Sequence, residues 1–440
     1  MKFRGLIIAV VVLLVLGGLL YWSNHRKPAP ESAAAASTAS PAILKMDQAA
    51  TSQVTLTRKD EPPVTLARQG ADTWRITEPK PFNADSDAVS GMLSSLSSLN
   101  ADRVVEDKAS DLKQYGLDQP SLQVEIETKD HKQHNLLFGD ETPTGSDVYA
   151  MLQGDAKVYT VASYNKTSID KGVNDLRDKR LVTIAPDKVS RVDVHKGNEE
   201  IEFARIKDGW QIQKPEPSRA DSFAVDEFVR TVADAKMDLT GNEQDHAATD
   251  FAKGAPLASV TLTGDRGPQT LTVRKNKQDY YAQSSAVDGT YKVDSNLGTA
   301  FDKSLDPYRN KKLFDFGYED PGKIELHEGS RSWFLTRSGN DWWSNGKKMD
   351  ASTVESLVDR LRNLSATSFP KSGFSNGDVE ATVTSNNGKR VEKVLISKSG
   401  SNDVAKRDKE PELYQLDASA VTAVTNAADA IKPASAPAKK

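Results

Sequence analysis

The chain repeats one pattern three times, at a period of about 130 residues, and this repetition constrains the fold more than any other feature of the sequence. In three separate stretches, apolar residues recur at i, i+3, i+4, i+7 and i+10, which is the spacing of an amphipathic helix. The stretches are Val89, Met92, Leu93, Leu96 and Leu99; Val225, Phe228, Val229, Val232 and Ala235; and Val354, Leu357, Val358, Leu361 and Leu364. We therefore expect three equivalent helices.

An aspartate stands four positions before the first valine of each stripe, at Asp85, Asp221 and Asp350. A carboxylate at the start of a helix can accept hydrogen bonds from free backbone N–H groups, and it interacts favourably with the helix dipole. We therefore assign these aspartates a structural role as helix caps.

Strand-like patterns surround each predicted helix. Apolar residues alternate with polar ones before the helix and end in a tryptophan, at Trp74, Trp210 and Trp342. Further strands follow the helix, with a valine nine residues beyond an aromatic residue, at Val124, Val260 and Val383. Period-two alternation predicts a β-meander before the helix and a sheet after it. The predicted fold class is α+β, with three tandem repeats of a β-meander, helix, β-sheet and helix behind one N-terminal transmembrane helix. We interpret the three tryptophans as core anchors rather than as a sugar-stacking surface.

The sequence pattern at the N-terminus indicates a membrane anchor. Residues 5–22 carry no charge and end in Tyr21 and Trp22, and about eighteen apolar residues are near the minimum that spans a bilayer. A cleavable signal peptide is the alternative, but no small-residue cleavage site follows closely. We expect an uncleaved signal-anchor that holds the protein in a bacterial inner membrane by a single pass, with the body in the periplasm.

Composition shifts divide the rest of the chain. We expect an anchor at 1–27, a Pro/Ala/Ser linker at 28–42, repeat units at 43–184, 185–320 and 321–432, and a disordered tail at 433–440.

The charge balance and the lack of cysteine exclude several functions. There are 58 Lys and Arg against 62 Asp and Glu, and they are scattered, so no one-sided basic surface for nucleic acid is expected. The absence of cysteine removes disulfides, cysteine-based metal sites and thiol nucleophiles.

Two polar clusters are candidate sites. His131 and His134 are the only closely spaced histidine pair, and they could face one metal ion from a turn, but further ligands are not evident. Asp140 and Glu141 form an acidic pair beside Gly139, without a phosphate-loop or nucleophile motif around it. We interpret both clusters as solvated hairpin tips and predict no catalytic residue, metal or cofactor.

Two basic runs recur, at residues 177–180 and 309–312. Arg177, Lys179, Arg309 and Lys311 could form a docking or lipid-headgroup patch. Alternatively, the two arginines make fixed ion pairs where one unit joins the next while the lysines are solvated, and we favour this second interpretation because Asp178 interrupts the first run.

One group of motifs carries a family resemblance. It comprises Tyr115-Gly116-Leu117 with Pro120, the stretches 138–145 and 148–150, Val158-Tyr159, and residues 176–179. These resemble the bacterial domain-of-unknown-function family number 4340, best over residues 48–184. In the second copy, residues 274–279 replace the run around Gly139. The resemblance implies a membrane-anchored extracytoplasmic protein, of a kind often encoded beside ABC-type export components of the gliding-motility sort, and it implies no catalytic residue.

These observations lead to one main hypothesis: a non-enzymatic periplasmic scaffold or accessory protein, with a protein partner in an ABC-type export complex. An envelope glycan- or peptide-binding module is the alternative. A hydrolase has no supporting motif.

Overall fold

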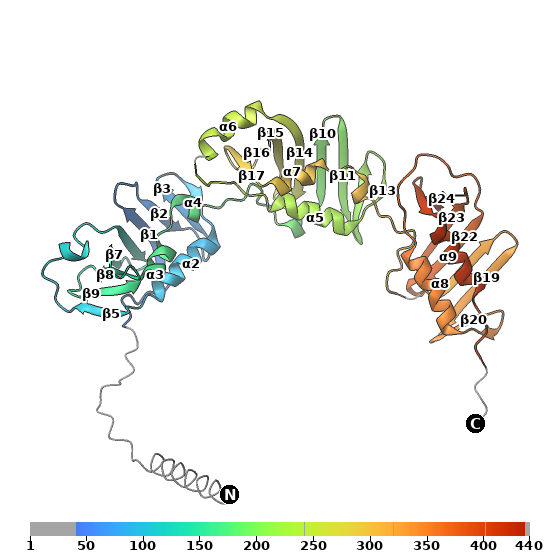
Figure 1. The fold of residues 1–440 in the computed structure, drawn as a ribbon, viewed down its shortest axis with the longest axis horizontal. Coiled ribbons are helices and arrows are strands. Elements are labelled where there is room, and N and C mark those ends of the chain that lie inside the picture. The colour runs from blue at the N-terminus through green and yellow to red at the C-terminus, as the bar shows by residue number, and fades with distance from the viewer. Residues whose placement is uncertain (1–40, 242, 320, 401, 436–440) are drawn as a thin grey trace, which may run out of the picture. The chain divides into compact units, whose positions relative to one another are not determined.

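The computed structural model describes residues 41–241, 243–319, 321–400 and 402–435 (Figure 1). The predicted anchor at 1–27 lies outside the described residues, as does nearly all of the predicted linker. Among the helices of the described part, none has the length and apolar character needed to cross a membrane. Contacts divide the chain into two compact units, one ending at Asp178 and the other beginning at Lys179.

The first sheet belongs to the first unit, and its strand order is β4-β3-β2-β1-β6-β7-β8-β9-β5. Its elements are β1 (Thr51–Arg58), β2 (Val64–Arg68), β3 (Trp74–Glu78), β4 (Phe82–Asn83), α2 (Ser86–Ser97), β5 (Arg103–Glu106), η1 (Lys113–Tyr115), β6 (Leu122–Thr128), β7 (Gln133–Glu141), β8 (Asp147–Leu152), β9 (Val158–Ala162), α3 (Ser163–Ile169) and α4 (Val173–Leu176).

The second sheet opens the second unit, with the order β13-β12-β11-β10-β14-β15-β16-β17. Its elements are η2 (Pro186–Lys188), β10 (Arg191–Lys196), β11 (Glu199–Ile206), β12 (Gly209–Lys214), β13 (Ser218–Arg219), α5 (Ser222–Ala233), α6 (Glu243–Lys253), β14 (Ala255–Gly264), β15 (Gly267–Asn276), β16 (Asp279–Ser284), β17 (Thr290–Val293), α7 (Ser295–Asp302) and η3 (Asp306–Tyr308).

The third sheet completes the second unit, with the order β21-β20-β19-β18-β22-β23-β24-β25. Its elements are β18 (Lys323–Glu328), β19 (Arg331–Ser338), β20 (Asp341–Ser344), β21 (Lys347–Lys348), α8 (Ala351–Asn363), β22 (Val379–Ser385), η4 (Asn386–Gly388), β23 (Arg390–Ser397), β24 (Asn402–Arg407), β25 (Leu413–Asp417) and α9 (Ala418–Asp429).

All three sheets are antiparallel and share one topology, which confirms the predicted three α+β repeats. In each, the first strand of the meander pairs with the strand that opens the second half of the sheet: β1 with β6, β10 with β14 and β18 with β22. Val194 lies opposite Val260, and Ile324 lies opposite Val383. This central pairing joins the two halves of each repeat into one sheet. The first sheet adds β5 at its edge.

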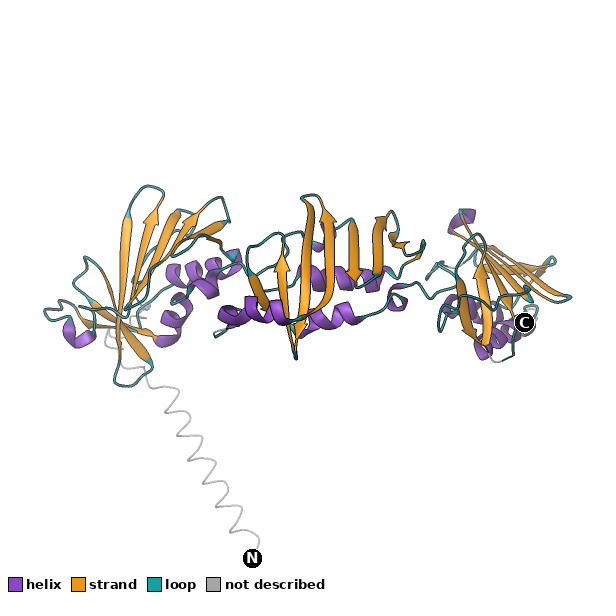
Figure 2. Ribbon diagram, turned by 90° about the horizontal axis from the view of Figure 1, so that it is seen from above, coloured by secondary structure: helices purple, strands orange, loops and turns teal. Residues whose placement is uncertain are grey.

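Each sheet buries one face under helices, as Figure 2 shows. The three predicted helical stripes are α2, α5 and α8, and their first valines, Val89, Val225 and Val354, are fully buried. Each stripe belongs to its own hydrophobic cluster. The three sheets therefore have three separate cores, and burial of these apolar stripes is the main stabilising contribution to each.

The capping aspartates occupy the predicted positions. Asp85 Oδ1 accepts hydrogen bonds from the backbone N–H groups of Asp87 and Ala88, at 3.0 and 3.1 Å. Asp221 and Asp350 are the N-caps of α5 and α8. Hydrogen bonds from the Ser352 hydroxyl and then from the Thr353 backbone lower the pKa of Asp350. The caps satisfy backbone donors that the first helical turn leaves free.

Helix α6 is an addition that the repeat pattern did not predict. Leu271 and Val273 of β15 point into the core of the second sheet, so Arg274 lies on the opposite face of the strand. Arg274 Nη1 donates a hydrogen bond to the carbonyl of Phe251 in α6, at 3.2 Å, and its guanidinium lies 5.2 Å from the Phe251 ring. Helix α6 therefore covers part of the sheet face that the core helices leave open.

A short lead-in segment precedes each repeat: residues 42–44, 180–182 and 312–314. Each segment forms an antiparallel bridge to the chain just after the first helix of its repeat, at Ala42 with Asn100, Arg180 with Lys236, and Lys312 with Ser365. Leu181 and Leu313 are fully buried, and they pack in the cores of the second and third sheets. The sequence-based unit limits remain a proposal, and this packing argues that the second and third repeats start earlier than 185 and 321.

Candidate functional site

The first basic run begins at a buried residue, Arg177, and ends at an exposed one, Arg180. Arg177 is only 4% exposed, and its guanidinium lies 4.0 Å from the centre of the Phe82 ring. Its backbone bridges to Ala84, next to the helix cap. Lys179 is half-buried, and its carbonyl accepts a hydrogen bond from Met237 at 2.8 Å. This placement favours the structural interpretation for Arg177.

The second run connects the second and third sheets within the second unit. Arg309 Nε lies 3.3 Å from Glu412 Oε1, and Nη1 lies 3.3 Å from Asp306 Oδ1. Its guanidinium also lies 5.0 Å from the ring of Phe369. Arg309 therefore makes the ion pair that the sequence suggested, whereas the side chain of Lys311 is exposed.

The two histidines of the pair lie in different local settings. His131 sits in a turn with a positive φ of 60°, and its Nδ1 lies 3.0 Å from Glu127 Oε1. His134 is a strand residue opposite Ile126. Within the described ranges, no group of three or more His, Asp and Glu side chains is arranged to hold a metal ion.

The glycines beside Asp140 serve a close packing of two backbone segments. A Cβ atom on Gly139 would lie 2.0 Å from the carbonyl oxygen of Tyr115, and one on Gly116 would lie 2.5 Å from the Asp140 carboxylate. The Tyr115 hydroxyl donates a hydrogen bond to Glu106 at 2.9 Å. Asp140 and Glu141 are exposed at the end of β7. The motif that carries the family resemblance thus joins the η1 turn to β7.

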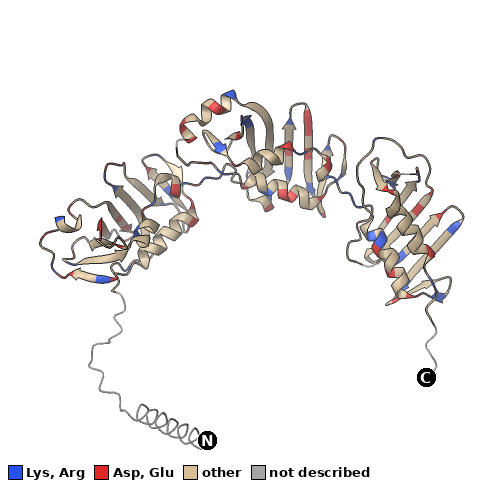
Figure 3. Ribbon diagram, in the orientation of Figure 1, with Lys and Arg blue, Asp and Glu red and all other residues tan. Residues whose placement is uncertain are grey.

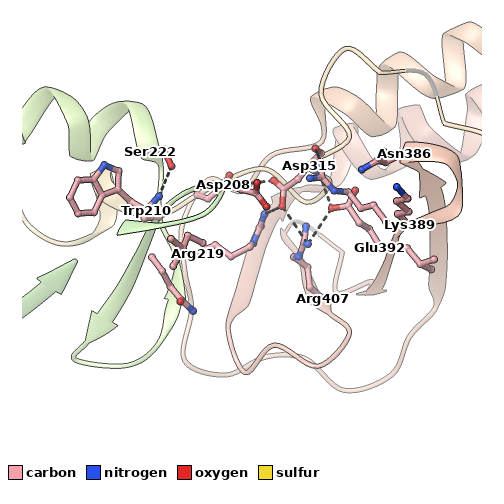
Figure 4. Close-up of a pocket in the computed structure, with 15 residues that line it drawn as sticks. Asp208, Trp210, Arg219, Ser222, Asp315, Asn386, Lys389, Glu392 and Arg407 are labelled. Carbon is pink, nitrogen blue, oxygen red and sulfur yellow. Dashed lines mark hydrogen bonds and ion pairs between the residues drawn. The ribbon is translucent and has the colours of Figure 1, made fainter. Parts of the chain in front are cut away.

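A charged cluster lies where the second and third sheets meet within the second unit (Figure 4). We call it the Arg219–Arg407 network, and its members are Arg219, Asp315, Glu392, Arg407 and Glu410. They come from the end of β13, the segment after the third lead-in, β23, the end of β24 and the loop before β25. None of these positions belongs to a recurring motif.

Asp315 and Glu410 link the two arginines of the network. Arg219 Nη1 lies 2.6 Å from Asp315 Oδ2, and its Nε lies 3.3 Å from Glu410 Oε2. Arg407 Nη2 lies 3.5 Å from the same Asp315 oxygen, and its Nε donates a hydrogen bond to Glu410 Oε1 at 2.9 Å. Each of the two acids therefore contacts both arginines, so the two sheets share one ion-pair system. Such a network holds its members in fixed geometry more effectively than isolated surface pairs.

Glu392 is the most deeply buried acid of the network. It is 5% exposed, and its Oε1 accepts hydrogen bonds from the Asp315 backbone N–H at 2.8 Å and from Arg407 Nη2 at 3.2 Å. Its Oε2 is buried without a hydrogen-bond partner among the described residues. Burial raises the pKa of Glu392 above its ordinary value of 4.5.

A pocket of about 760 Å³ opens beside the network. From the second sheet it is lined by Ile206, Asp208, Trp210, Gln211, Arg219, Ala220 and Ser222, and from the third repeat by Asn310, Asp315, Asn386, Lys389, Arg390, Val391, Glu392 and Arg407. Figure 4 shows the labelled side chains of both groups around it. It is larger than four other pockets of the described residues, whose volumes lie between about 330 and 620 Å³.

Comparison with protein families gives one match, to the domain of unknown function DUF4340, over residues 74–219 and 210–387. The chain belongs to the DUF4340 family. The two matched segments run through the first and second repeats and into the third, which agrees with the repetition in the sequence and in the sheets.

Comparison with solved structures gives Pseudomonas aeruginosa sliding clamps. The DNA polymerase III subunit beta is 8% identical over 86% of this chain and 94% of the clamp, with a TM-score of 0.14. A sliding clamp from the same organism with a ligand is 8% identical over 85% and 93% of the two chains, also at 0.14. At these TM-scores the likeness carries no argument about this DUF4340 protein. A comparison with curated proteins found no match.

Sequence reasoning did not find the Arg219–Arg407 network of the DUF4340 chain, because its members come from distant segments. The sequence gives no signal at this position: Arg219 stands two residues before the capping Asp221, where the first and third copies have Asn83 and Lys348, so the three copies share no residue there.

Proposed function

We propose that this DUF4340 protein is a non-enzymatic scaffold anchored in the inner membrane by residues 5–22, with its three repeats in the periplasm. The observation that supports this proposal best is the repeated architecture, in which three similar repeats follow one another along the chain and each has a lead-in segment that pairs with the chain just after its first helix. Tandem repeats joined in this way present several similar surfaces to partners along one chain.

The open sheet faces are the surfaces offered to partners. In the third sheet, Glu325, Thr382 and Lys393 lie on the face opposite the core, because they alternate with the buried residues of β18, β22 and β23. Lys and Arg are interspersed with Asp and Glu on all three sheets (Figure 3). A mixed, polar face is compatible with a specific and reversible protein contact.

The recurring residues act in the fold, which also supports a scaffold. The capping aspartates bind helix N-termini, and Trp74, Trp210 and Trp342 are 6%, 3% and 3% exposed. The tryptophans therefore cannot form a sugar-stacking platform, which weakens the glycan-binding alternative. The peptide-binding alternative is favoured by the pocket beside the Arg219–Arg407 network.

We further propose that the partner is a component of an ABC-type export complex. This step rests on the family resemblance alone. The test uses the full chain as bait in detergent-solubilised membranes, and co-purification of transporter subunits is the expected result. Failure to capture any envelope protein would contradict the scaffold. So would turnover of a glycan or peptide by the purified protein, lost on changing one polar residue without unfolding.

Lys311 allows the predicted docking patch to be tested in the same experiment. If this exposed lysine docks, Lys311→Glu should reduce capture several-fold. Lys303→Glu, an exposed position before η3, is the matched control and should capture normally. Equal capture by the two variants would remove Lys311 from the docking surface.

The membrane topology needs a separate test. A reporter that is active only in the periplasm, fused after Lys440, should be active, and a reporter that is active only in the cytoplasm should be silent. The reverse pattern would contradict the proposed topology, and a mature N-terminus beyond Trp22 would show cleavage instead of anchoring.

A further inference from the structure

Two cations at the rim of the 760 Å³ pocket have no acidic partner. Lys389 and Arg390 follow the turn between β22 and β23, and neither makes an ion pair with any described residue. The guanidinium of Arg390 donates a hydrogen bond to the backbone carbonyl of Asp315 through Nη1, and its other N–H groups remain available. By contrast, Arg219 and Arg407 are already neutralised within the network. The pocket lining as a whole has four cations against the three acids Asp208, Asp315 and Glu392, so it keeps an excess of positive charge, and Lys389 and Arg390 are its cations without an ion pair.

Two aliphatic side chains lie beside these cations. Ile206 is 47% exposed and Val391 is 63% exposed, and both line the same pocket. Large apolar side chains with this much exposure cost free energy in water unless something covers them. The pocket thus combines unpaired cations with uncovered aliphatic groups.

The inner wall supplies a hydrogen-bond acceptor. Glu392 is 5% exposed and lines the pocket, and its Oε2 has no partner among the described residues. A buried acceptor without a partner is unfavourable, and a ligand that brings an N–H group relieves that cost.

We propose that this pocket binds an acidic, aliphatic peptide segment of a partner protein. Carboxylates of the segment pair with Lys389 and Arg390, an aliphatic side chain packs on Ile206 and Val391, and a backbone N–H of the segment donates to Glu392. The proposal rests on the scaffold function above and names the chemistry of its partner.

A peptide matches these features better than an acidic glycan does. Both could supply carboxylates, and both could donate a hydrogen bond to Glu392. A glycan, however, prefers flat aromatic faces, whereas Trp210 is only 3% exposed and the uncovered groups, Ile206 and Val391, are branched aliphatics. Aliphatic side chains of a peptide cover such groups more completely.

The corresponding pocket of the first repeat lacks the cationic feature. It has a volume of about 420 Å³ and is lined by Arg68, Asp72, Trp74 and Asp87, among others. Arg68 donates to the carbonyls of Thr51, Ala71 and Gln48, so its guanidinium is satisfied within the protein. The proposed peptide site is therefore particular to the second unit.

The test measures binding of a dye-labelled peptide, Gly-Glu-Val-Asp-Leu-Glu-Gly, to the purified full chain by fluorescence anisotropy. The same peptide with lysine at each acidic position is the ligand control. Binding of the acidic peptide should weaken about tenfold as salt rises from about 50 mM to about 300 mM, because the contacting charges are near the surface. The lysine peptide should not bind.

Variants locate the site. The double variant Lys389→Glu with Arg390→Glu should weaken acidic-peptide binding at least about tenfold. Val391→Ser should weaken it about threefold, through loss of apolar contact alone. Arg266→Glu is the matched control, because Arg266 is an exposed cation in the equivalent β14–β15 turn of the second sheet, and its affinity should stay at the wild-type value. All these side chains are at least partly exposed, and thermal unfolding of each variant verifies the fold.

Wild-type affinity in the double variant, or equal binding of the two peptides, would overturn the proposal. Binding of an oligogalacturonate with no binding of the acidic peptide would overturn it in favour of a glycan. The pull-down separates this proposal from the scaffold function. A double variant that still captures the wild-type partner refutes the peptide site and leaves the scaffold intact, whereas failure of the wild-type chain to capture any partner refutes the scaffold itself.

Discussion

Glu392 holds Arg407 with one carboxylate oxygen, at 3.2 Å, and keeps its other oxygen buried without a hydrogen bond. The first contact stabilises the Arg219–Arg407 network, and the second carries a cost. A fully satisfied network fixes its members strongly, whereas a partly satisfied one remains sensitive to protonation and to ligands. The Glu392 side chain therefore influences both the stability and the ligand binding of the second unit.

The pH dependence of stability should reflect this burial. Because the pKa of Glu392 is raised above 4.5, its contribution to stability is fully present below the ordinary pKa and is lost as the pH rises through the raised value. Burial also raises the pKa of Glu412, so the two acids act in the same direction. Glu392→Gln should flatten the fall in unfolding free energy above pH 4.5 in chemical denaturation. Glu355→Gln, at an exposed position on α8, should retain the wild-type curve, and a Glu392→Gln curve identical to wild type would contradict the prediction.

Removal of Arg407 should be costly. Its side chain is 11% exposed, and its loss would leave Glu392 as a buried charge without a cation. We expect Arg407→Ala to lower the free energy of unfolding of the second unit by about 3–5 kcal/mol, measured by urea denaturation. Arg331→Ala removes an arginine from an ion pair that is half exposed in the same sheet, and it should have little effect. A small loss in both variants would show that the network contributes no stability.

Two glycines of the first unit should respond in opposite ways to alanine. A Cβ at Gly139 would lie 2.0 Å from a backbone oxygen, so Gly139→Ala should destabilise the unit and separate η1 from β7. No atom lies within 4 Å of a Cβ at Gly91 in α2, so Gly91→Ala should stabilise the helix by about 0.5–1 kcal/mol. Thermal unfolding compares the two variants, and a tolerated Gly139→Ala would disprove the close approach.

Removal of the capping aspartate should destabilise the first and second repeats to the same extent. Asp85→Ala and Asp221→Ala each remove an acceptor for first-turn N–H groups, and each should lower unfolding free energy by about 1 kcal/mol. Asp85→Asn and Asp221→Asn keep an acceptor and should stay close to wild type. Hydrogen exchange of α2 and α5 provides the measurement. Protection that is unchanged in the alanine variants would exclude a capping contribution.

Much of the fold followed from the sequence because its signals are local. The spacing of Val89, Val225 and Val354 with their neighbours specifies a buried helical face, and an aspartate before a helix has one simple structural use. The shared sheet topology followed because alternation and turn residues recur in each copy. Helix α6 was missed since residues 243–253 have a single buried position, Ala247, and so lack an apolar stripe.

The candidate site could not be predicted in the same way. Arg219 and Glu410 are separated by almost two hundred residues, and their contact depends on how β13 and the loop before β25 approach each other. The basic runs were visible, but their roles depend on burial: Arg177 is covered, whereas Lys311 is exposed. Ion pairs between residues that are far apart in the chain produce no periodic pattern in the sequence.

The lead-in segments determine which fragment of the chain keeps a complete core when a repeat is transferred to another protein. A fragment that begins at β18 keeps every strand of the third sheet and loses Leu313 and Phe314, which pack in its core. A fragment that begins at Lys311 keeps both residues and the bridge from Lys312 to Ser365. Exchange or duplication of a repeat therefore preserves the core only if the cut falls inside the basic run, so this run marks the modular boundary of the chain.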